Sequence, residues 1–132
     1  MKVKTSELIG APLDWAVLEV LKPHLSGPAS ADIGTFGPLF GRGYKYPCWG
    51  GRKYSPSTSW EYGGPIIEHE GIQLTKEDRA VWNATMWWDD TDGAGEVVMR
   101  GPTLLVAAMR CYVAVRLGSE IDIPAELTHA IF

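Results

Sequence analysis

The clearest secondary-structure signal in the chain is GPTLLVAAMRCYVAVRLG, residues 101–118. Pro102 suits the first turn of a helix, and Gly118 suits the position just past a helix end. Nearly every residue between them is apolar, apart from Arg110 and Arg116. Because a helix that is apolar on most sides is usually buried, we predict a core helix here that packs against a small sheet.

A second helix is predicted nearer the N-terminus. Its apolar residues recur at spacings of three and four, which is the period of an amphipathic helix. Thr5 or Ser6 is a candidate cap at its start, and Pro23 follows its expected end near residue 21. The residues that carry this period are Leu13, Ala16, Val17, Val20 and Leu21.

Residues 66–74 predict a pair of short strands. Residues 66–69 are apolar and β-branched at their start, so they favour a strand. Glu70 and Gly71 suit its turn, and residues 72–74 suit the partner strand.

Residues 75–88 allow two interpretations. Thr75 followed by Asp78 resembles the capping box that opens a helix. The β-branched and aromatic residues that follow instead favour a strand. We favour a turn and then a strand, followed by an acidic turn at residues 89–95 and a short strand at residues 96–99.

Helix- and strand-breaking residues dominate residues 27–51, which carry seven glycines and three prolines. We expect loops and at most one short strand there, within a long loop region that extends over about residues 27–64. Residues 3–6 suit a short extended start. Ile121 and Ile123 suit an edge strand before Pro124.

The chain has 132 residues, a length that suits one domain, residues 1–132. Its apolar share of 45% and charged share of 21% are typical of a globular protein rather than a disordered one. The predicted fold class is therefore α+β, with two main helices packed on a short, mainly antiparallel sheet and with many loops.

The net charge of −4 disfavours non-specific nucleic-acid binding, which depends on Lys and Arg neutralising phosphates. The chain shows no apolar run of signal-peptide type and none of the roughly twenty residues that a membrane helix needs. Cys48 and Cys111 are too few for a disulfide scaffold, so we expect two reduced thiols.

No catalytic set, metal site or cofactor is predicted. The three histidines are scattered without the spacing of metal ligands, and neither cysteine lies in a CxxC motif. The acidic turn at residues 89–95 lacks the glutamate that closes a calcium loop, so a solvated turn is favoured.

Cations and aromatic rings are interleaved along residues 42–62 of this acidic chain, and Arg52, Tyr54 and Trp60 belong to this segment. Cations bind phosphate and rings stack on bases, so the mixture suits a nucleotide or a single-stranded segment. The alternative is that the rings anchor a long loop to the core while the cations are solvated.

Hydroxyl side chains at Ser55, Ser57 and Thr58 precede the pair Gly63 and Gly64. Hydroxyls and glycine-exposed backbone N–H groups are good anion partners. They are equally good turn formers, so both interpretations stay open.

Arg100 and Thr103 stand at the start of the predicted core helix. The free N–H groups and positive dipole end of a helix attract phosphate, although simple capping explains the same residues. Arg110 lies in the middle of that helix. We expect it to pair with a carboxylate such as Asp14 or Glu68, or to face a pocket.

Three blocks resemble one family: MKVKTSELIGAPLDWAV, YSPSTSWEYGGPIIE and GPTLLVAAMRCYVAVRLGSEIDIP. They are similar, in this order, to the NinX-type proteins of tailed phages, a family of unknown function. The blocks cover roughly half of the chain, and residues 27–51 and 76–97 match less clearly.

The resemblance implies a phage or prophage origin and a place in the cytoplasm of the infected bacterial host. It supplies no catalytic residues. It is also a reason to expect that Asp14 and Trp15, residues 54–68 and residues 100–110 converge on one site. By analogy, some small phage accessory proteins sequester the nucleotide signals of bacterial immunity.

We therefore expect a protein that binds a small anionic, nucleotide-like molecule without catalysis. The alternatives are a protein–protein interaction module that uses exposed tryptophans, and a nucleotide-processing enzyme. A homo-oligomer, with a dimer favoured, is also expected. The candidate ligand-binding residues are Asp14, Trp15, Arg52, Tyr54, Ser55, Ser57, Thr58, Trp60, Gly63, Gly64, Arg100, Thr103 and Arg110.

Overall fold

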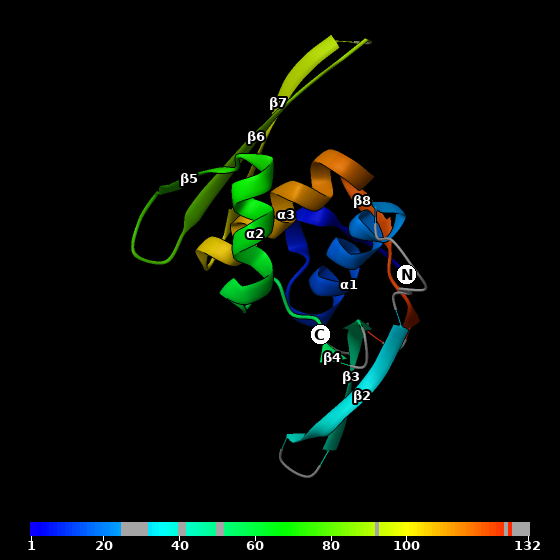
Figure 1. Ribbon diagram of the computed structural model, residues 1–132. Helices are drawn as coiled ribbons and strands as arrows, with labels where there is room; N and C mark the ends of the chain where they lie inside the picture. The colour runs from blue at the N-terminus through cyan, green and yellow to red at the C-terminus, as the bar shows by residue number, and fades with distance from the viewer. Residues whose placement is uncertain (25–31, 40–41, 50–51, 92, 126, 128–132) are drawn as a thin grey trace.

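The computed structural model describes residues 1–24, 32–39, 42–49, 52–91, 93–125 and 127 (Figure 1). Its described part contains the three α-helices α1 (Gly10–Leu21), α2 (Trp60–Glu70) and α3 (Leu104–Leu117). Two short 3-10 helices, η1 (Thr5–Glu7) and η2 (Lys22–His24), flank α1. Helix α3 contacts both α1 and α2, so it is the element around which the described chain is arranged.

The prediction of a core helix at residues 101–118 is confirmed by α3. Thr103 is its N-cap, and its side chain accepts a hydrogen bond of 3.1 Å from the N–H of Val106. Gly118 follows the helix with φ of 96°, a conformation that favours glycine. Pro102 lies just before the cap rather than in the first turn. The buried residues of α3 are Leu105, Val106, Ala107, Ala108, Met109, Cys111, Tyr112 and Val113.

The predicted N-terminal helix ends where expected, but its start was placed too early. Thr5 and Ser6 belong to η1, and the chain is extended at Leu8 and Ile9 before α1 begins at Gly10. Thr5 is buried and donates its hydroxyl to the carbonyl of Gly118 at 2.6 Å. Thr5, which resembled a helix cap, therefore links the N-terminal segment to the chain just after α3.

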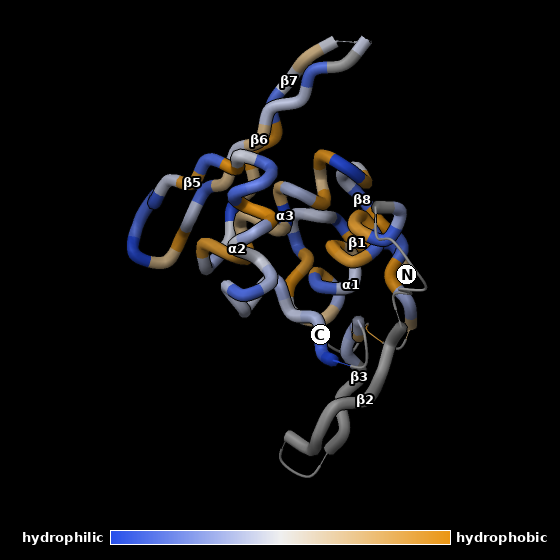
Figure 2. The backbone as a smooth tube through the Cα atoms, in the orientation of Figure 1, coloured by the Kyte–Doolittle hydropathy of each residue, from blue (hydrophilic) through white to orange (hydrophobic). Residues whose placement is uncertain are grey.

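Two short strands at the ends of the chain pair with each other. β1 (Lys2–Lys4) and β8 (Glu120–Asp122) are antiparallel, with Val3 opposite Ile121. Both of these central residues are buried. The predicted extended start is confirmed at residues 3–4 but not at Thr5 and Ser6, and the predicted edge strand is confirmed at Ile121 but not at Ile123. Figure 2 shows that apolar segments gather where β1 and β8 meet α1, whereas the loop between β5 and β6 begins with a strongly hydrophilic segment.

The prediction of loops over residues 27–51 was wrong for most of the described part. β2 (Asp32–Leu39) and β3 (Arg42–Trp49) form an antiparallel hairpin, and β4 (Arg52–Lys53) adds a third strand. Glycine and proline weaken a strand without forbidding it at an edge or a bulge, and the register of this hairpin shifts between Phe36 and Pro38. The many glycines and prolines of this segment therefore led to a wrong prediction of loops.

The third sheet confirms the prediction of a turn and a strand over residues 75–88. β5 (Gln73–Lys76), β6 (Trp82–Asp90) and β7 (Gly93–Gly101) are antiparallel in that order. β6 and β7 extend further than predicted, so the acidic turn is shorter than residues 89–95. Figure 1 shows the distal end of this hairpin reaching beyond the helices.

The prediction of a strand at residues 66–69 was wrong, because these residues lie in α2. Tyr62, Ile66 and Glu70 are spaced four apart and share the face that turns toward α3. Gly71 ends the helix in the left-handed conformation with φ of 64°. The adjacent isoleucines Ile66 and Ile67 resembled a strand because the helical spacing of Tyr62, Ile66 and Glu70 was overlooked.

The described elements form a small single-domain α+β fold with three helices and eight strands in three small sheets, where one sheet was predicted. Cys48 and Cys111 are both buried thiols. Within the described residues, none of the helices has the length and apolar character needed to cross a membrane.

Candidate functional site

The N-terminal ends of the three described α-helices border one pocket of about 460 Å³, which we call the three-helix pocket. The pocket has three walls, and each is formed by a different one of the three sequence blocks. The expected convergence of these blocks therefore exists in the structure, although at partly different residues. The described lining residues are Ile9, Gly10, Ser57, Thr58, Trp60, Pro102, Thr103, Leu104, Leu105 and Val106.

The first wall is the start of α1. Ile9 is the N-cap residue in an extended conformation, and its side chain makes no capping hydrogen bond. Gly10 has φ of 62°, which favours glycine, and no heavy atom lies within 4 Å of the place where a Cβ would stand. The wall is therefore open backbone with a positive helix end behind it.

The second wall is the start of α2 and the turn before it. The N–H groups of Thr58 and Ser59 donate to the carbonyl of Ser55 at 3.2 and 2.8 Å, which forms this turn. Ser59 is the N-cap, again without a side-chain cap. Trp60 follows and is 57% exposed, so a large part of its ring surface is accessible at the pocket.

The third wall is the start of α3. Thr103 provides both its hydroxyl and its carbonyl to the first turn, to the N–H groups of Val106 and Ala107. The N–H groups of Leu104 and Leu105 precede the first intrahelical bond, as in any helix. Their side chains make this wall apolar.

Ser57 is 1% exposed, and its hydroxyl forms no hydrogen bond with the described residues. Its backbone N–H donates to Asp14 Oδ1 at 2.8 Å. The hydroxyl also lies near enough to this carboxyl to favour its charged form, without hydrogen-bond geometry. Ser57 lines the three-helix pocket, and a buried hydroxyl normally has a hydrogen-bond partner.

Asp14, on α1, is 3% exposed and lies behind the second wall, where it contacts Ser57. Burial raises the pKa of this carboxyl to about 7, and hydrogen bonding with Ser57 and the charge of Lys53 oppose that rise. The carboxyl is therefore a structural acceptor that ties α1 to the turn at residues 55–58.

Arg110 ties the other two walls together. Its Nε donates to the carbonyl of Leu8 at 2.7 Å, and one terminal nitrogen donates to the carbonyl of Arg100 at 2.8 Å. The expected pairing with Asp14 or Glu68 was wrong, because backbone carbonyls take the guanidinium instead. Arg110 thus fixes the chain just before α1 relative to the chain just before α3.

Several other predicted residues lie outside the three-helix pocket. The side chain of Arg100 forms an ion pair with Glu77, and Arg52 is exposed on β4. Trp15 is partly buried and packs against the core. Arg42 and Lys45 are further cations of the segment 42–62 in which a nucleotide site was predicted, and their side chains lie outside the described part of the chain.

The two glycines of α2 differ in surroundings. A Cβ on Gly63 would lie 2.4 Å from the carbonyl oxygen of Pro56 and 2.6 Å from Leu105, so this glycine allows close packing. A Cβ on Gly64 would meet only the ring of Trp60, at 3.3 Å. Close packing is thus an alternative explanation for Gly63, which was predicted as ligand-facing backbone.

A second pocket, which we call the aromatic pocket, measures about 420 Å³ and lies beside α2. Tyr54, 3% exposed, contributes to it rather than to the three-helix pocket. Sequence reasoning missed most of its residues, although the helical spacing of those on α2 was a usable signal. The described lining residues are Leu21, Trp49, Tyr54, Glu61, Tyr62, Pro65, Ile66, His69, Glu70 and Tyr112.

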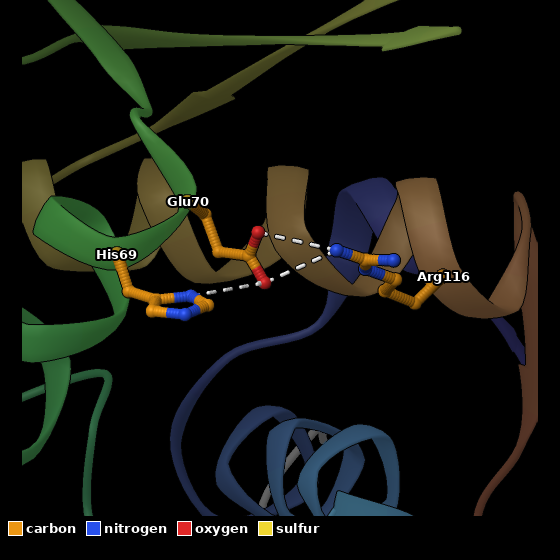
Figure 3. Close-up of polar contacts among 3 residues, drawn as sticks. All are labelled: His69, Glu70 and Arg116. Carbon is orange, nitrogen blue, oxygen red and sulfur yellow. Dashed lines mark hydrogen bonds and ion pairs between the residues drawn. The ribbon is translucent and has the colours of Figure 1, made fainter. Parts of the chain in front are cut away.

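One edge of the aromatic pocket carries a chain of charged groups (Figure 3). Arg116 donates to both carboxylate oxygens of Glu70 at 3.1 Å, and His69 Nδ1 lies 3.9 Å from the same carboxylate. Glu70 thus joins α2 to α3. Among the described residues, no group of three His, Cys, Asp or Glu side chains is placed to hold a metal ion.

Comparison with known proteins gives one family match. The model of a family described as "Bacteriophage P22, NinX" matches residues 4–116, which include all three walls of the three-helix pocket. No curated protein matches the chain.

Proposed function

Because the chain belongs to the bacteriophage P22 NinX family, we propose that it is a phage accessory protein that binds a small anionic, nucleotide-like molecule in the three-helix pocket. The observation that carries this proposal is the meeting of three helix N-termini around one pocket that also contains a buried hydroxyl without a partner among the described residues. Sequestration of a signalling nucleotide in the cytoplasm of the host is the role that fits such binding.

Helix N-termini favour anions for two reasons. The first-turn N–H groups lack intrahelical acceptors, and the aligned peptide dipoles place partial positive charge at that end. Two of the three described helices start without a side-chain cap, at Ile9 and Ser59. Pro12 in the first turn of α1 has no N–H, so the donors open to a ligand oxygen are those of Gly10, Ala11, Trp60 and Glu61. The hydroxyl of Ser57 adds a further donor.

The rest of the lining suits an aromatic or apolar body. Ile9, Leu104 and Leu105 provide aliphatic surface, and the exposed ring of Trp60 provides a face on which a base can stack. No described Lys or Arg lines the pocket. The anion would therefore be held by backbone N–H groups and helix dipoles, which suits one phosphate better than a highly charged polyphosphate.

Binding is testable with the purified full chain. Native mass spectrometry and thermal shift are measured with a panel of nucleoside monophosphates and dinucleotides, and with the matching nucleosides as controls. We expect saturable binding that requires the phosphate. A chain that retains no nucleotide from the panel or from host extract, and shows no thermal shift, would contradict the proposal.

The variant Trp60→Ala removes the proposed stacking surface, and its exposed side chain makes this change tolerable for folding. We expect binding to weaken by about 5- to 150-fold, since stacking contributes about 1–3 kcal/mol per base. Trp87→Ala is the matched control, because Trp87 is 56% exposed and lies outside this pocket. Equal losses in both variants would contradict the assignment of the site.

A protein–protein interaction module is the second candidate, and the β6–β7 hairpin favours it. Trp87 is 56% exposed, Trp88 39% and Val98 52%. Exposed aromatic residues are enriched at interface centres, and the partner is either a host or phage factor or a second copy of the chain. Light scattering and recovery of a stoichiometric partner from infected cells test this, and Trp87→Ala should abolish the association.

A further inference from the structure

The aromatic pocket has a chemistry that the proposed anion site does not explain. Its described lining includes the rings of Trp49, Tyr54, Tyr62 and Tyr112. Tyr54 is the centre of this group, with its ring centroid 5.7 Å from that of Trp49 and 5.0 Å from that of Tyr62. The rings are steeply inclined to one another, at 75° and 55°, as in the wall of a cage rather than in a stack.

The charged groups of the pocket are acidic. Glu61 and Glu70 both line it, and no described Lys or Arg does. Glu61 is exposed and forms no ion pair with the described residues. His69 is the one described basic side chain in the lining, and it is 86% exposed. The pocket therefore offers negative potential together with electron-rich ring surface.

The structure already contains one cation in this kind of environment. The guanidinium of Arg116 lies between the carboxylate of Glu70 and the ring of Tyr112, 6.0 Å from the ring centroid (Figure 3 shows the Glu70 contact). Arg116 itself is outside the described pocket lining. It pairs with Glu70 from outside the lining, which leaves Glu61 and the partly exposed rings of Trp49 and Tyr62 to a ligand, with the buried ring of Tyr54 behind them.

We propose that the aromatic pocket binds a small organic cation, an alkylated ammonium or a guanidinium group. Aromatic rings attract such cations through the ring quadrupole, and a carboxylate at the rim adds Coulomb attraction. A pocket of about 420 Å³ accommodates a trimethylammonium group with its attached chain. The same group could come from a free metabolite or from a modified side chain of another protein.

The test uses choline and its neutral isostere 3,3-dimethyl-1-butanol with the purified full chain. Both carry three equivalent methyl groups, whose proton NMR signals broaden on binding. We expect saturable choline binding with a Kd on the order of 1 mM, and binding of the alcohol at least about ten-fold weaker. Equal binding of the two ligands, or no saturable choline binding, would overturn the proposal.

Two charge-neutralising variants on one helix locate the site. Glu61→Gln should weaken choline binding about 3- to 10-fold and leave binding of the alcohol unchanged. Glu68→Gln is the control, because Glu68 is an exposed residue of the same helix outside the pocket lining. Equal weakening in both variants would mean general surface electrostatics and would overturn the site.

A second ligand distinguishes the two sources of the cation, a free metabolite and a modified protein side chain. A peptide with one trimethyllysine is compared with its unmodified form under the same conditions. A preference for choline over the trimethylated peptide assigns a free metabolite, and the reverse assigns a protein side chain. Trp60→Ala leaves both unchanged, which distinguishes this pocket from the proposed nucleotide site.

Discussion

At the scale of single residues, two polar side chains hold the walls of the three-helix pocket in place. Asp14 accepts from the N–H of Ser57, and Arg110 donates to the carbonyls of Leu8 and Arg100. Each side chain bonds to backbone of a segment distant in the sequence. Their contribution is therefore to geometry, and substitution should first affect folding stability.

Asp14→Asn should make the protein more stable at pH 8 and change little at pH 4. The folded carboxyl has a pKa of about 7, whereas the unfolded one titrates near 3.8. Between these values the unfolded chain releases a proton that the folded chain keeps, so wild-type stability falls as pH rises to 7. The amide stays neutral and still accepts from Ser57.

The expected gain above pH 7 is up to about 4 kcal/mol, since one pKa unit corresponds to about 1.4 kcal/mol. Urea unfolding of both proteins between pH 4 and pH 8 measures it. Asp14→Ala, which also removes the acceptor of Ser57 N–H, should destabilise the protein at pH 4 by about 1–3 kcal/mol. A pH-independent difference between the Asp14→Asn variant and the wild-type protein would contradict the raised pKa.

Arg110→Met should lower the free energy of unfolding by about 2 kcal/mol, because two carbonyls lose a charged donor. Arg116→Met is the matched change on the same helix. Its ion pair with Glu70 is 47% exposed on the arginine side, so the loss should stay below about 1 kcal/mol. Urea unfolding at pH 7 compares the two, and equal losses would contradict the linking role of Arg110.

Residue identity alone predicted that Arg110 needed partners, but it could not identify them. A buried or half-buried arginine can be satisfied by carboxylates or by carbonyls, and the carbonyls of Leu8 and Arg100 come from chain turns that no periodicity reveals. Asp14 was likewise visible as a candidate. Its acceptor role depends on a backbone N–H 43 residues away.

At the scale of elements, α2 contains one glycine whose surroundings leave no room for a side chain and one whose surroundings accept a methyl group. A Cβ on Gly63 would approach Pro56 and Leu105 to distances that no real Cβ shows, whereas one on Gly64 would meet only the ring of an exposed tryptophan. The two neighbours share a helix and differ in surroundings. They are therefore a controlled pair for measuring how tightly α2 is packed.

Gly63→Ala should destabilise the protein by about 1–3 kcal/mol through overpacking. Gly64→Ala should stabilise it by about 0.5–1 kcal/mol, because alanine favours a helix interior over glycine and the Trp60 ring can shift. Thermal and urea unfolding measure both variants. Similar effects of the two substitutions would mean that α2 is not packed as closely as the structure shows.

The sequence predicted α3, the end of α1 and the strand of residues 82–88 because periodicity and terminating residues agreed there. It failed at α2, where Ile66 and Ile67 resembled the start of a strand. It also failed at the β2–β3 hairpin, whose glycines and prolines resembled a loop. Both failures come from tertiary contacts that override local preference.

At the scale of the whole molecule, the candidate site exists because three segments meet. The family blocks were a reason to expect that meeting, but the start of α1 at Gly10 and the start of α2 at Trp60 were not predicted. Only the start of α3 was. Because the starts of two of these three helices were not predicted, the pocket between them could not be predicted from the sequence either.

The pairing of β1 with β8 also belongs to this scale. Met1 adds to it, since its carbonyl accepts from Ile123 N–H at 2.8 Å and its amino group pairs with Asp122 at 2.8 Å. Deletion of residues 1–4 should lower the free energy of unfolding by at least about 3 kcal/mol, because Val3 is buried and β8 loses its partner strand.

Urea unfolding of the deletion variant at pH 7 measures this loss. The double variant with Lys2→Ala and Lys4→Ala keeps the strand backbone and removes only exposed side chains, so it should change stability by less than about 0.5 kcal/mol. An unchanged unfolding midpoint after the deletion would show that the strand pair adds nothing to the fold.

The same strand pair has a consequence for synthesis on the ribosome. Ile121, the partner of Val3, is added to the chain only about ten seconds after Val3 at ordinary translation rates. During that interval β1 has no strand to pair with, and the nascent chain exposes it to proteases and chaperones. Chains stalled before residue 120 should therefore lose their first residues to digestion, whereas released chains should keep them.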